Sequence, residues 1–191
     1  IEKITKYDRR KQNLADEIKR VEESDEFNKE KIIEDLEKKD TLGKINFDSV
    51  IISAFDETLK SITTSLIYTD VSPKKIYFIT LNQWFDESLL NEDSSQNLFF
   101  PSINKKNFDE FKKEYSRKYS SEPNQISLLG FDLVGLIYYL SKMNNFQLSS
   151  KAFDQKNTFK GKIGLFEIED KRIKHVLNFY KVENNKFKKI F

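Results

Sequence analysis

The hydrophobic pattern is most regular between residues 47 and 86, where two short apolar runs flank a stretch of helical periodicity. The first run, residues 50–52, is β-branched and is typical of a strand that is covered on both faces. A helix is then expected to begin at Asp56, a residue type that can cap a helix N-terminus. Pro73 stops that helix, and residues 76–79 predict a second buried strand. The apolar positions of the helix are Leu59, Ile62 and Leu66.

Two strands joined by a helix of this length almost always lie parallel. The loops that follow the two strands, residues 53–56 and 80–84, are therefore expected at the carboxyl edge of the sheet, where crevices form in open α/β sheets. Trp84 is the only tryptophan and lies in the second loop. We interpret it either as part of such a crevice or as a core residue that anchors the loop.

The pattern on either side predicts more helices. Residues 1–39 combine helical spacing with dense charge, which indicates two helices or one bent helix near residues 24–25, packed on their own domain. Residues 108–119 predict an amphipathic helix whose aromatic face is Phe108, Phe111, Tyr115 and Tyr119. Residues 126–143 are apolar nearly all round, so we expect that helix to be buried or to lie in an interface.

Strand patterns return at the C-terminus. Residues 165–169 and 173–182 alternate around a turn at 170–172, which predicts an antiparallel hairpin, and residues 187–191 follow a further turn. The expected fold class is therefore α/β: a lobe built on a parallel sheet and completed by a C-terminal antiparallel hairpin.

Composition narrows the range of functions. The chain of 191 residues is 38% hydrophobic and 14% aromatic, which is enough for a core in one domain or two small lobes. Its 33 basic and 31 acidic side chains nearly cancel to +2, so we expect no nucleic-acid partner. Cysteine is absent, and no uninterrupted run reaches the roughly 18–20 apolar residues of a membrane span, so none is expected.

Motifs for chemistry are largely missing from the sequence. The single histidine, His175, lies in a strand pattern without a nucleophile elbow, so we interpret it as structural. Metal-ligand spacings and phosphate-binding glycine loops are absent. Glu167 and Glu169 share a strand face as in a glycosidase pair, but we interpret them as solvent-facing. We therefore expect no catalytic residue, no metal and no cofactor.

Several segments, in this order, resemble a known family. Residues 111–123, 129–140 and 159–166 look like the C-terminal half of type I periplasmic solute-binding proteins of the leucine/isoleucine/valine-binding kind. Four further segments most resemble the penicillin-binding protein activator branch of that family. They are Tyr7-Asp-Arg-Arg10, Asp40-Thr-Leu-Gly43, Phe47-Asp-Ser-Val50 and Thr80-Leu-Asn-Gln-Trp-Phe-Asp86.

The resemblance implies two α/β lobes that face each other across a cleft. Residues 1–98 and 158–191 would form the C-terminal lobe, and residues 99–157 would supply a crossing segment and helices of an N-terminal lobe that is partly missing. The chain begins with Ile1 and is expected to be a fragment or processed form of a longer protein. The expected cleft wall is Phe55, Asp56, Thr80, Asn82, Gln83 and Trp84.

The resemblance also implies a function. Activator-branch proteins are non-catalytic, outer-membrane-anchored lipoproteins of the periplasm that dock on a peptidoglycan synthase, a penicillin-binding protein. The alternative within the family is a receptor that binds an amino acid or similar small solute for an ABC uptake transporter. The helix at residues 126–143 would lack the N-terminal lobe's sheet as its support. It is therefore also expected to drive self-association.

Overall fold

A computed structural model describes residues 1–147, 149–154 and 156–191, and the chain divides into two compact units. The first unit comprises residues 1–81, 87–99 and 182–186, and the second comprises residues 82–86, 100–181 and 187–191. Residues 158–181 thus group with the helices before them. Leu148 and Gln155, which fall in the predicted 99–157 segment, lie outside the described residues. The assignment of these segments to lobes of a longer protein remains a prediction.

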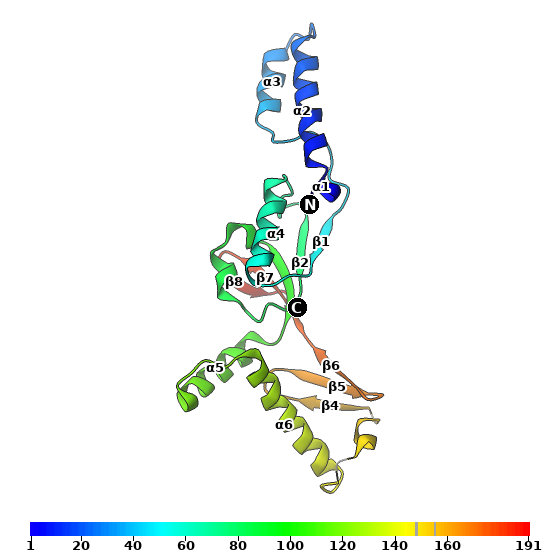
Figure 1. The fold of residues 1–191 in the computed structure, drawn as a ribbon, viewed down its shortest axis with the longest axis vertical. Coiled ribbons are helices and arrows are strands. Elements are labelled where there is room, and N and C mark those ends of the chain that lie inside the picture. The colour runs from blue at the N-terminus through cyan, green and yellow to red at the C-terminus, as the bar shows by residue number, and fades with distance from the viewer. Residues whose placement is uncertain (148, 155) are drawn as a thin grey trace. The chain divides into compact units, whose positions relative to one another are not determined.

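The N-terminal segment forms two main helices, as one of the sequence alternatives predicted. After the short helix α1 (Glu2–Thr5), α2 (Tyr7–Glu22) and α3 (Lys29–Glu37) run side by side within the first unit (Figure 1). Their apolar faces meet in a small core of their own, and most of the charged residues remain on the outer faces, whereas Arg10 of α2 is buried. This core is built on Leu14, Val21 and Leu36.

The central strand–helix–strand unit is confirmed. Strand β1 (Ser49–Ile52), helix α4 (Asp56–Tyr68) and strand β2 (Tyr77–Thr80) follow one another. The two strands pair in parallel, from Ser49 opposite Tyr77 to Ile52 opposite Thr80. Asp56 is the first residue of α4, but α4 has no side-chain capping hydrogen bond, so the predicted cap is wrong.

The expectation that both strands are covered on both faces is also wrong. Ile52 and Phe78 are buried, whereas Ile51 is 74% exposed and Tyr77 is exposed as well. Successive side chains of a strand point to opposite faces, so one face of this pair is covered and the other is open. A β-branched run predicts the strand but not how many faces of it other elements cover.

The remaining strands extend this sheet. The 3-10 helices η1 (Glu87–Asn91) and η2 (Asp93–Ser95) lead into β3 (Leu98–Ser102), which pairs in parallel with β2. Strands β7 (Asn178–Glu183) and β8 (Lys186–Lys189) lie near the end of the chain. The order in the five-stranded sheet is β1-β2-β3-β7-β8.

The second unit combines two helices with a separate antiparallel sheet. Its helices are α5 (Lys105–Tyr119) and α6 (Gln125–Met143), followed by the 3-10 helix η3 (Ser150–Phe153). Strands β4 (Asn157–Lys160), β5 (Leu165–Glu169) and β6 (Arg172–Val176) form the sheet in that order. Helix α6 packs on this sheet through a core of Leu136, Leu140 and Ile168 (Figure 1).

The β5–β6 hairpin is confirmed, with Glu169 opposite Arg172 at its turn. The predicted second strand, residues 173–182, is however not one strand. It breaks at Leu177 into β6 and β7, which belong to different sheets. The sequence carries a local sign of the break, because the consecutive apolar residues Val176 and Leu177 interrupt the alternation.

Candidate functional site

The predicted cleft residues fall in both units and are described within each. In the first unit, Phe55 precedes α4 in an extended conformation and is exposed, and Asp56 is exposed with a left-handed φ of 49°. Thr80 is buried, and its hydroxyl donates to the carbonyl oxygen of Ile52 at 2.9 Å. Thr80 therefore ties β2 to β1 and does not present its hydroxyl to solvent.

In the second unit, the side-chain oxygen of Asn82 is engaged with the fold. The Asn82 Oδ1 atom accepts from the backbone N–H of Trp84 at 3.0 Å and from the Ser102 hydroxyl at 2.8 Å. Gln83 is buried. Trp84 is half-buried, with a left-handed φ of 49°. The oxygen that an asparagine would offer to a ligand is thus used to shape the loop.

The residue that anchors this loop is Phe85, which the sequence did not single out. Its buried ring packs edge-on against the ring of Tyr180, with centroids 4.9 Å apart. The Lys105 ammonium lies 5.3 Å from the centre of the Phe85 ring. Phe85 therefore anchors the loop. The assignment of Trp84 to a ligand cleft remains a prediction. The other aromatic partners of Phe85 are Phe100, Phe108 and Phe187.

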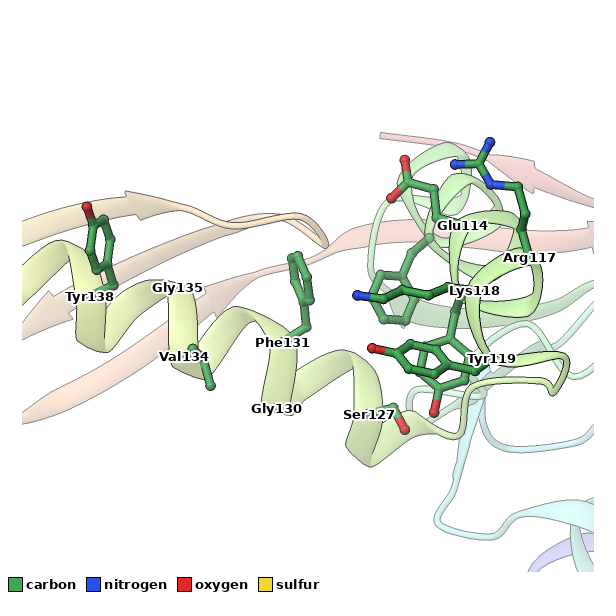
Figure 2. Close-up of a pocket in the computed structure, with 12 residues that line it drawn as sticks. Glu114, Arg117, Lys118, Tyr119, Ser127, Gly130, Phe131, Val134, Gly135 and Tyr138 are labelled. Atoms are coloured by element: carbon green, nitrogen blue, oxygen red, sulfur yellow. The ribbon is translucent and has the colours of Figure 1, made fainter.

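A large cavity of the second unit lies between α5 and α6, and we call it the α5–α6 groove. It has a volume of about 1030 Å³ and is open to solvent. Aromatic rings form much of its wall, since Phe111, Tyr115 and Tyr119 lie one turn apart on α5. Figure 2 shows Phe131, Val134 and Tyr138 along the α6 side, with Lys118 extending from α5 toward Phe131.

The α5–α6 groove carries a net positive charge. Arg117 and Lys118 line it at the C-terminal end of α5, and neither forms an ion pair with any residue that the structure describes. The Lys118 ammonium lies 5.3 Å from the centre of the Tyr119 ring. The one acidic lining residue, Glu114, is paired with Lys162 at 3.1 Å. Neither cation is therefore within ion-pair distance of a carboxylate among the described residues.

A second groove, between α6 and the β4–β6 sheet, has a volume of about 360 Å³ and an almost wholly apolar wall. Its one charged lining residue, Asp132, is only 4% exposed. Its carboxylate accepts from the backbone N–H groups of Lys162, at 2.7 Å, and Ile163, at 3.0 Å. A Cβ atom on Gly161 would lie 2.2 Å from Asp132 Oδ2, so this approach requires glycine. Asp132 therefore acts as a structural clamp, in the sense that its carboxylate holds the loop at residues 161–163 against α6.

His175 has a structural environment, as the sequence suggested. Its ring stacks on Phe166 with centroids 4.3 Å apart and planes 15° from parallel. Its Nε2 atom is buried with no hydrogen-bond partner among the described residues, and a Cβ on Gly164 would lie 2.7 Å from it. Burial lowers the pKa of His175 below its ordinary value of 6.5, and the nearby Asp132 carboxylate partly opposes that shift.

Helix α6 exposes much of its apolar surface. Ile126 is 77% exposed and Val134 is 68% exposed. Among the described residues, α6 is the one helix that is long and apolar enough to cross a membrane, judged by length and composition alone. The sequence criterion of an uninterrupted apolar run does not select α6, because polar residues, among them Asp132 and Lys142, interrupt it. Within the fold, however, α6 packs on a sheet through Leu136 and Leu140 and clamps a loop through Asp132.

The residues described in the structure include no group of three or more His, Cys, Asp or Glu side chains that could hold a metal ion. The carboxylates considered for catalysis have surface partners. Glu167 lies opposite Lys174 in the β5–β6 pair, and Glu169 is 3.5 Å from the Lys156 ammonium. These positions favour the solvent-facing interpretation made from the sequence.

The fold is that of the type I periplasmic binding proteins. A structure described as a branched-chain amino acid ABC transporter from Rhodospirillum rubrum matches with a TM-score of 0.60 and 12% identity, over 84% of this chain and 48% of that one. The leucine-binding protein LivK from Thermotoga maritima matches with a TM-score of 0.55 and 16% identity, over 77% of this chain and 45% of that one.

A third structure, the C-domain of LpoA from Haemophilus influenzae, described as a regulator of PBP1A, has a TM-score of 0.49 and 10% identity. That likeness covers 93% of this chain and 49% of the other, and at this TM-score it carries no argument. The chain spans about half the length of these three structures. No protein-family model and no curated protein sequence matches the chain. The similarity therefore defines the fold, and not the function.

Proposed function

We propose that this chain is part of a non-catalytic periplasmic protein that regulates peptidoglycan synthesis by docking on a peptidoglycan synthase. The observation that carries the proposal is the engagement of the predicted cleft loops with their own fold. Thr80 donates to the Ile52 carbonyl oxygen, and Asn82 Oδ1 accepts from Trp84 and Ser102. A solute site needs polar groups that converge on the ligand, and two of the predicted ones, the Thr80 hydroxyl and the Asn82 side-chain oxygen, are bonded within the chain.

A second observation supports the activator-like reading. Two of the segments that resemble the activator branch meet in one buried network, because the Arg10 guanidinium donates to the Thr41 hydroxyl and to the Asp70 carboxylate. The backbone N–H of Leu42 also donates to the Arg10 carbonyl oxygen at 3.0 Å. These residues therefore hold a framework and do not serve a ligand.

The alternative function is a receptor for an amino acid or similar small solute. It is favoured by the backbone likeness to proteins described as leucine-binding and as a branched-chain amino acid transporter. The exposed Phe55 and half-buried Trp84 are the side chains that such a cleft would use. Under both functions the protein works in the periplasm. A lipoprotein anchor to the outer membrane belongs to the first function alone.

A thermal-shift screen of the full-length gene product separates the two functions. The screen covers the common amino acids and peptidoglycan fragments, each at high concentration. A ligand at one hundred times its Kd adds about 2.7 kcal/mol to the folded state, which raises Tm by several degrees. The docking function predicts no rise with any amino acid. A reproducible rise with one class of amino acid would establish the solute receptor and refute the docking function.

A further inference from the structure

We propose that the loop between β4 and β5, residues 161–164, is an acid-released latch, which Asp132 and His175 hold closed and which protonation of His175 opens. The loop, both side chains and the elements that carry them lie within the second unit. The inference is independent of the proposed function, because it rests on contacts inside this unit alone.

The loop is a hairpin connection that can move without unpairing its strands. Lys160 of β4 lies opposite Leu165 of β5, so residues 161–164 span the gap between the two strands. Inside the loop, the Gly161 N–H donates to the Gly164 carbonyl oxygen at 2.8 Å. The strands are held by their own antiparallel ladder, so the position of the loop against α6 depends on the side chains that hold it there.

Asp132 holds the middle of the loop. Its side chain is buried, and its Oδ1 atom accepts from the Lys162 backbone N–H at 2.7 Å. Its Oδ2 atom accepts from the Ile163 backbone N–H at 3.0 Å, and the Ile163 side chain is fully buried. Each oxygen of this carboxylate therefore accepts a backbone N–H group while the loop is closed.

His175 lies against the C-terminal end of the loop. A Cβ added at Gly164 would be 2.7 Å from His175 Nε2, so the imidazole edge is in close contact with the Gly164 backbone. Stacking on Phe166 fixes the plane of the ring. The Nε2 atom is buried without a hydrogen-bond partner among the described residues. A neutral ring tolerates this position because Nε2 need not carry a proton, whereas an imidazolium would carry a charged N–H there with no acceptor.

The sheet around His175 offers no counter-charge within the described strands. Residues directly opposite each other in an antiparallel ladder share a face, and those that share the face of His175 are uncharged. They are Asn157, Phe159, Phe166, Ile168 and Ile173. The charged residues of these strands lie on the opposite face, and they are Lys160, Glu167, Glu169, Arg172 and Lys174.

Of the charged groups that other described elements bring near, the Asp132 carboxylate is the one whose charge acts on His175. Lys162 of the loop directs its ammonium to Glu114 of α5, at 3.1 Å. Lys142, the other charged residue of α6, lies about three turns further along the helix. Among the described residues, an imidazolium would therefore gain a counter-charge only by drawing Asp132 away from the loop.

Proton binding is thus coupled to the position of the loop. Burial lowers the pKa of His175 below 6.5 in the closed loop, and the charge of Asp132 only partly opposes that shift. An open loop exposes Nε2 to water, which returns the pKa toward its ordinary value. This contribution to the closed loop is fully present above about pH 6.5 and is lost as the pH falls through the lower, closed-state pKa.

Amide hydrogen exchange, followed residue by residue by NMR, tests the latch. The readouts are the protection factors of the Lys162 and Ile163 N–H groups, which correct for the intrinsic effect of pH on exchange. Between about pH 7.5 and about pH 5 we expect both to fall about tenfold. The amide of Leu140, in the core between α6 and the sheet, should stay better protected than the loop at both pH values, because the loop opens locally. Equal protection of the loop and of Leu140 would mean that the loop opens only when the unit unfolds, and would overturn the proposal.

Two variants assign the effect to His175. His175→Phe keeps an aromatic ring on Phe166 but binds no proton, so the protection of the loop should change by less than about twofold over the same interval. His175→Gln serves the same purpose if the larger ring disturbs Gly164. The matched control is Lys174→Gln, which removes a charge from the opposite face of β6 and should keep the fall of about tenfold. If the fall persists in both His175 variants, another group opens the loop and the proposal fails.

An NMR titration of the His175 ring supplies an independent readout. Its midpoint should lie below pH 6.5, and the amide shifts of Lys162 and Ile163 should change with the same midpoint. A ring that titrates while the loop amides stay unmoved would show that the closed loop accommodates the imidazolium, and would overturn the proposal. Protection of the loop that rises as the pH falls would overturn it as well, since His175 would then strengthen the contact with Asp132.

Discussion

The Arg10 guanidinium lies against the Asp70 carboxylate, with Arg10 Nη2 2.7 Å from Asp70 Oδ2. This ion pair joins α2 to the turn that follows α4, across 60 residues of sequence. Arg10 is only 5% exposed and also donates to the carbonyl oxygen of Thr69 at 3.3 Å. A buried cation with several acceptors holds these segments in a defined arrangement, because loss of Asp70 leaves the charge unpaired and loss of a neutral acceptor leaves a buried N–H group without a partner.

Asp70→Ala should destabilise the chain by about 2 kcal/mol, since it leaves the buried Arg10 guanidinium without its counter-charge. This figure is below the full penalty for a buried pair because the Asp70 side chain is 38% exposed. Urea denaturation followed by circular dichroism measures it. The matched control is Lys19→Ala, which removes an exposed pair at 3.9 Å and should change stability by less than about 0.5 kcal/mol. Equal losses of stability in the two variants would mean that the Arg10–Asp70 network does not stabilise the chain.

Asp132→Ala should cost about 1–3 kcal/mol, because the backbone N–H groups of Lys162 and Ile163 lose their shared acceptor in a buried position. Asp132→Asn keeps one carbonyl oxygen and should lose less. Gly161→Ala should also destabilise the unit, since its Cβ would clash with the carboxylate. Thermal denaturation compares the three variants. A clamp of the proposed kind is refuted if Asp132→Ala melts at the same temperature as the unmodified chain.

Much of the backbone could be predicted from local pattern. The β1–α4–β2 unit follows from an apolar run, a helical period behind Asp56 and a proline stop, and these signals are all local. The exposure of Ile51 could not be predicted, because it depends on which distant elements cover each face of the sheet. The break at Leu177 had a local sign in the adjacent apolar residues Val176 and Leu177, but the sheet that each half joins depends on distant elements.

Acidification should destabilise the second unit through His175. Burial lowers the folded-state pKa of His175 below its unfolded value near 6.5, so the unfolded chain binds the proton more readily. The contribution is fully present above pH 6.5 and is lost as the pH falls from there through the lower, folded-state pKa. His175→Gln removes it, so the Tm of the variant should fall less than that of the unmodified chain between pH 7.5 and pH 5. Parallel Tm curves for the two proteins over this interval would contradict the assignment.

Trp84→Ala tests the predicted cleft. Trp84 is half-buried beside the anchored Phe85, so its truncation should leave the fold intact with a modest loss of stability. The docking function predicts an unchanged affinity for a peptidoglycan synthase, because the side-chain oxygen of Asn82 in this loop is bonded within the chain. Biolayer interferometry compares the variant with Phe85→Ala, which should unfold the aromatic cluster and abolish binding. A selective loss of amino-acid binding in Trp84→Ala would support the receptor instead.

The site was less predictable than the fold. The aromatic face of α5, with Phe111, Tyr115 and Tyr119, and the apolar surface of α6 were both visible in the sequence. Their meeting in one groove was not, because a helix that is apolar all round gives no direction for its packing. The role of Phe85 was hidden in the same way. The sequence analysis considered the neighbouring Trp84 as the anchor of the loop because of its residue type. In the structure, tertiary packing makes Phe85 the anchor.

The most direct test of the docking function is the affinity of the full-length gene product for the periplasmic part of a peptidoglycan synthase from the same organism, measured by biolayer interferometry. The account predicts saturable binding with a Kd in the micromolar range or below, unaffected by added amino acids. Absence of binding, together with a rise in Tm of several degrees on addition of one amino acid, would contradict the account and identify a solute receptor.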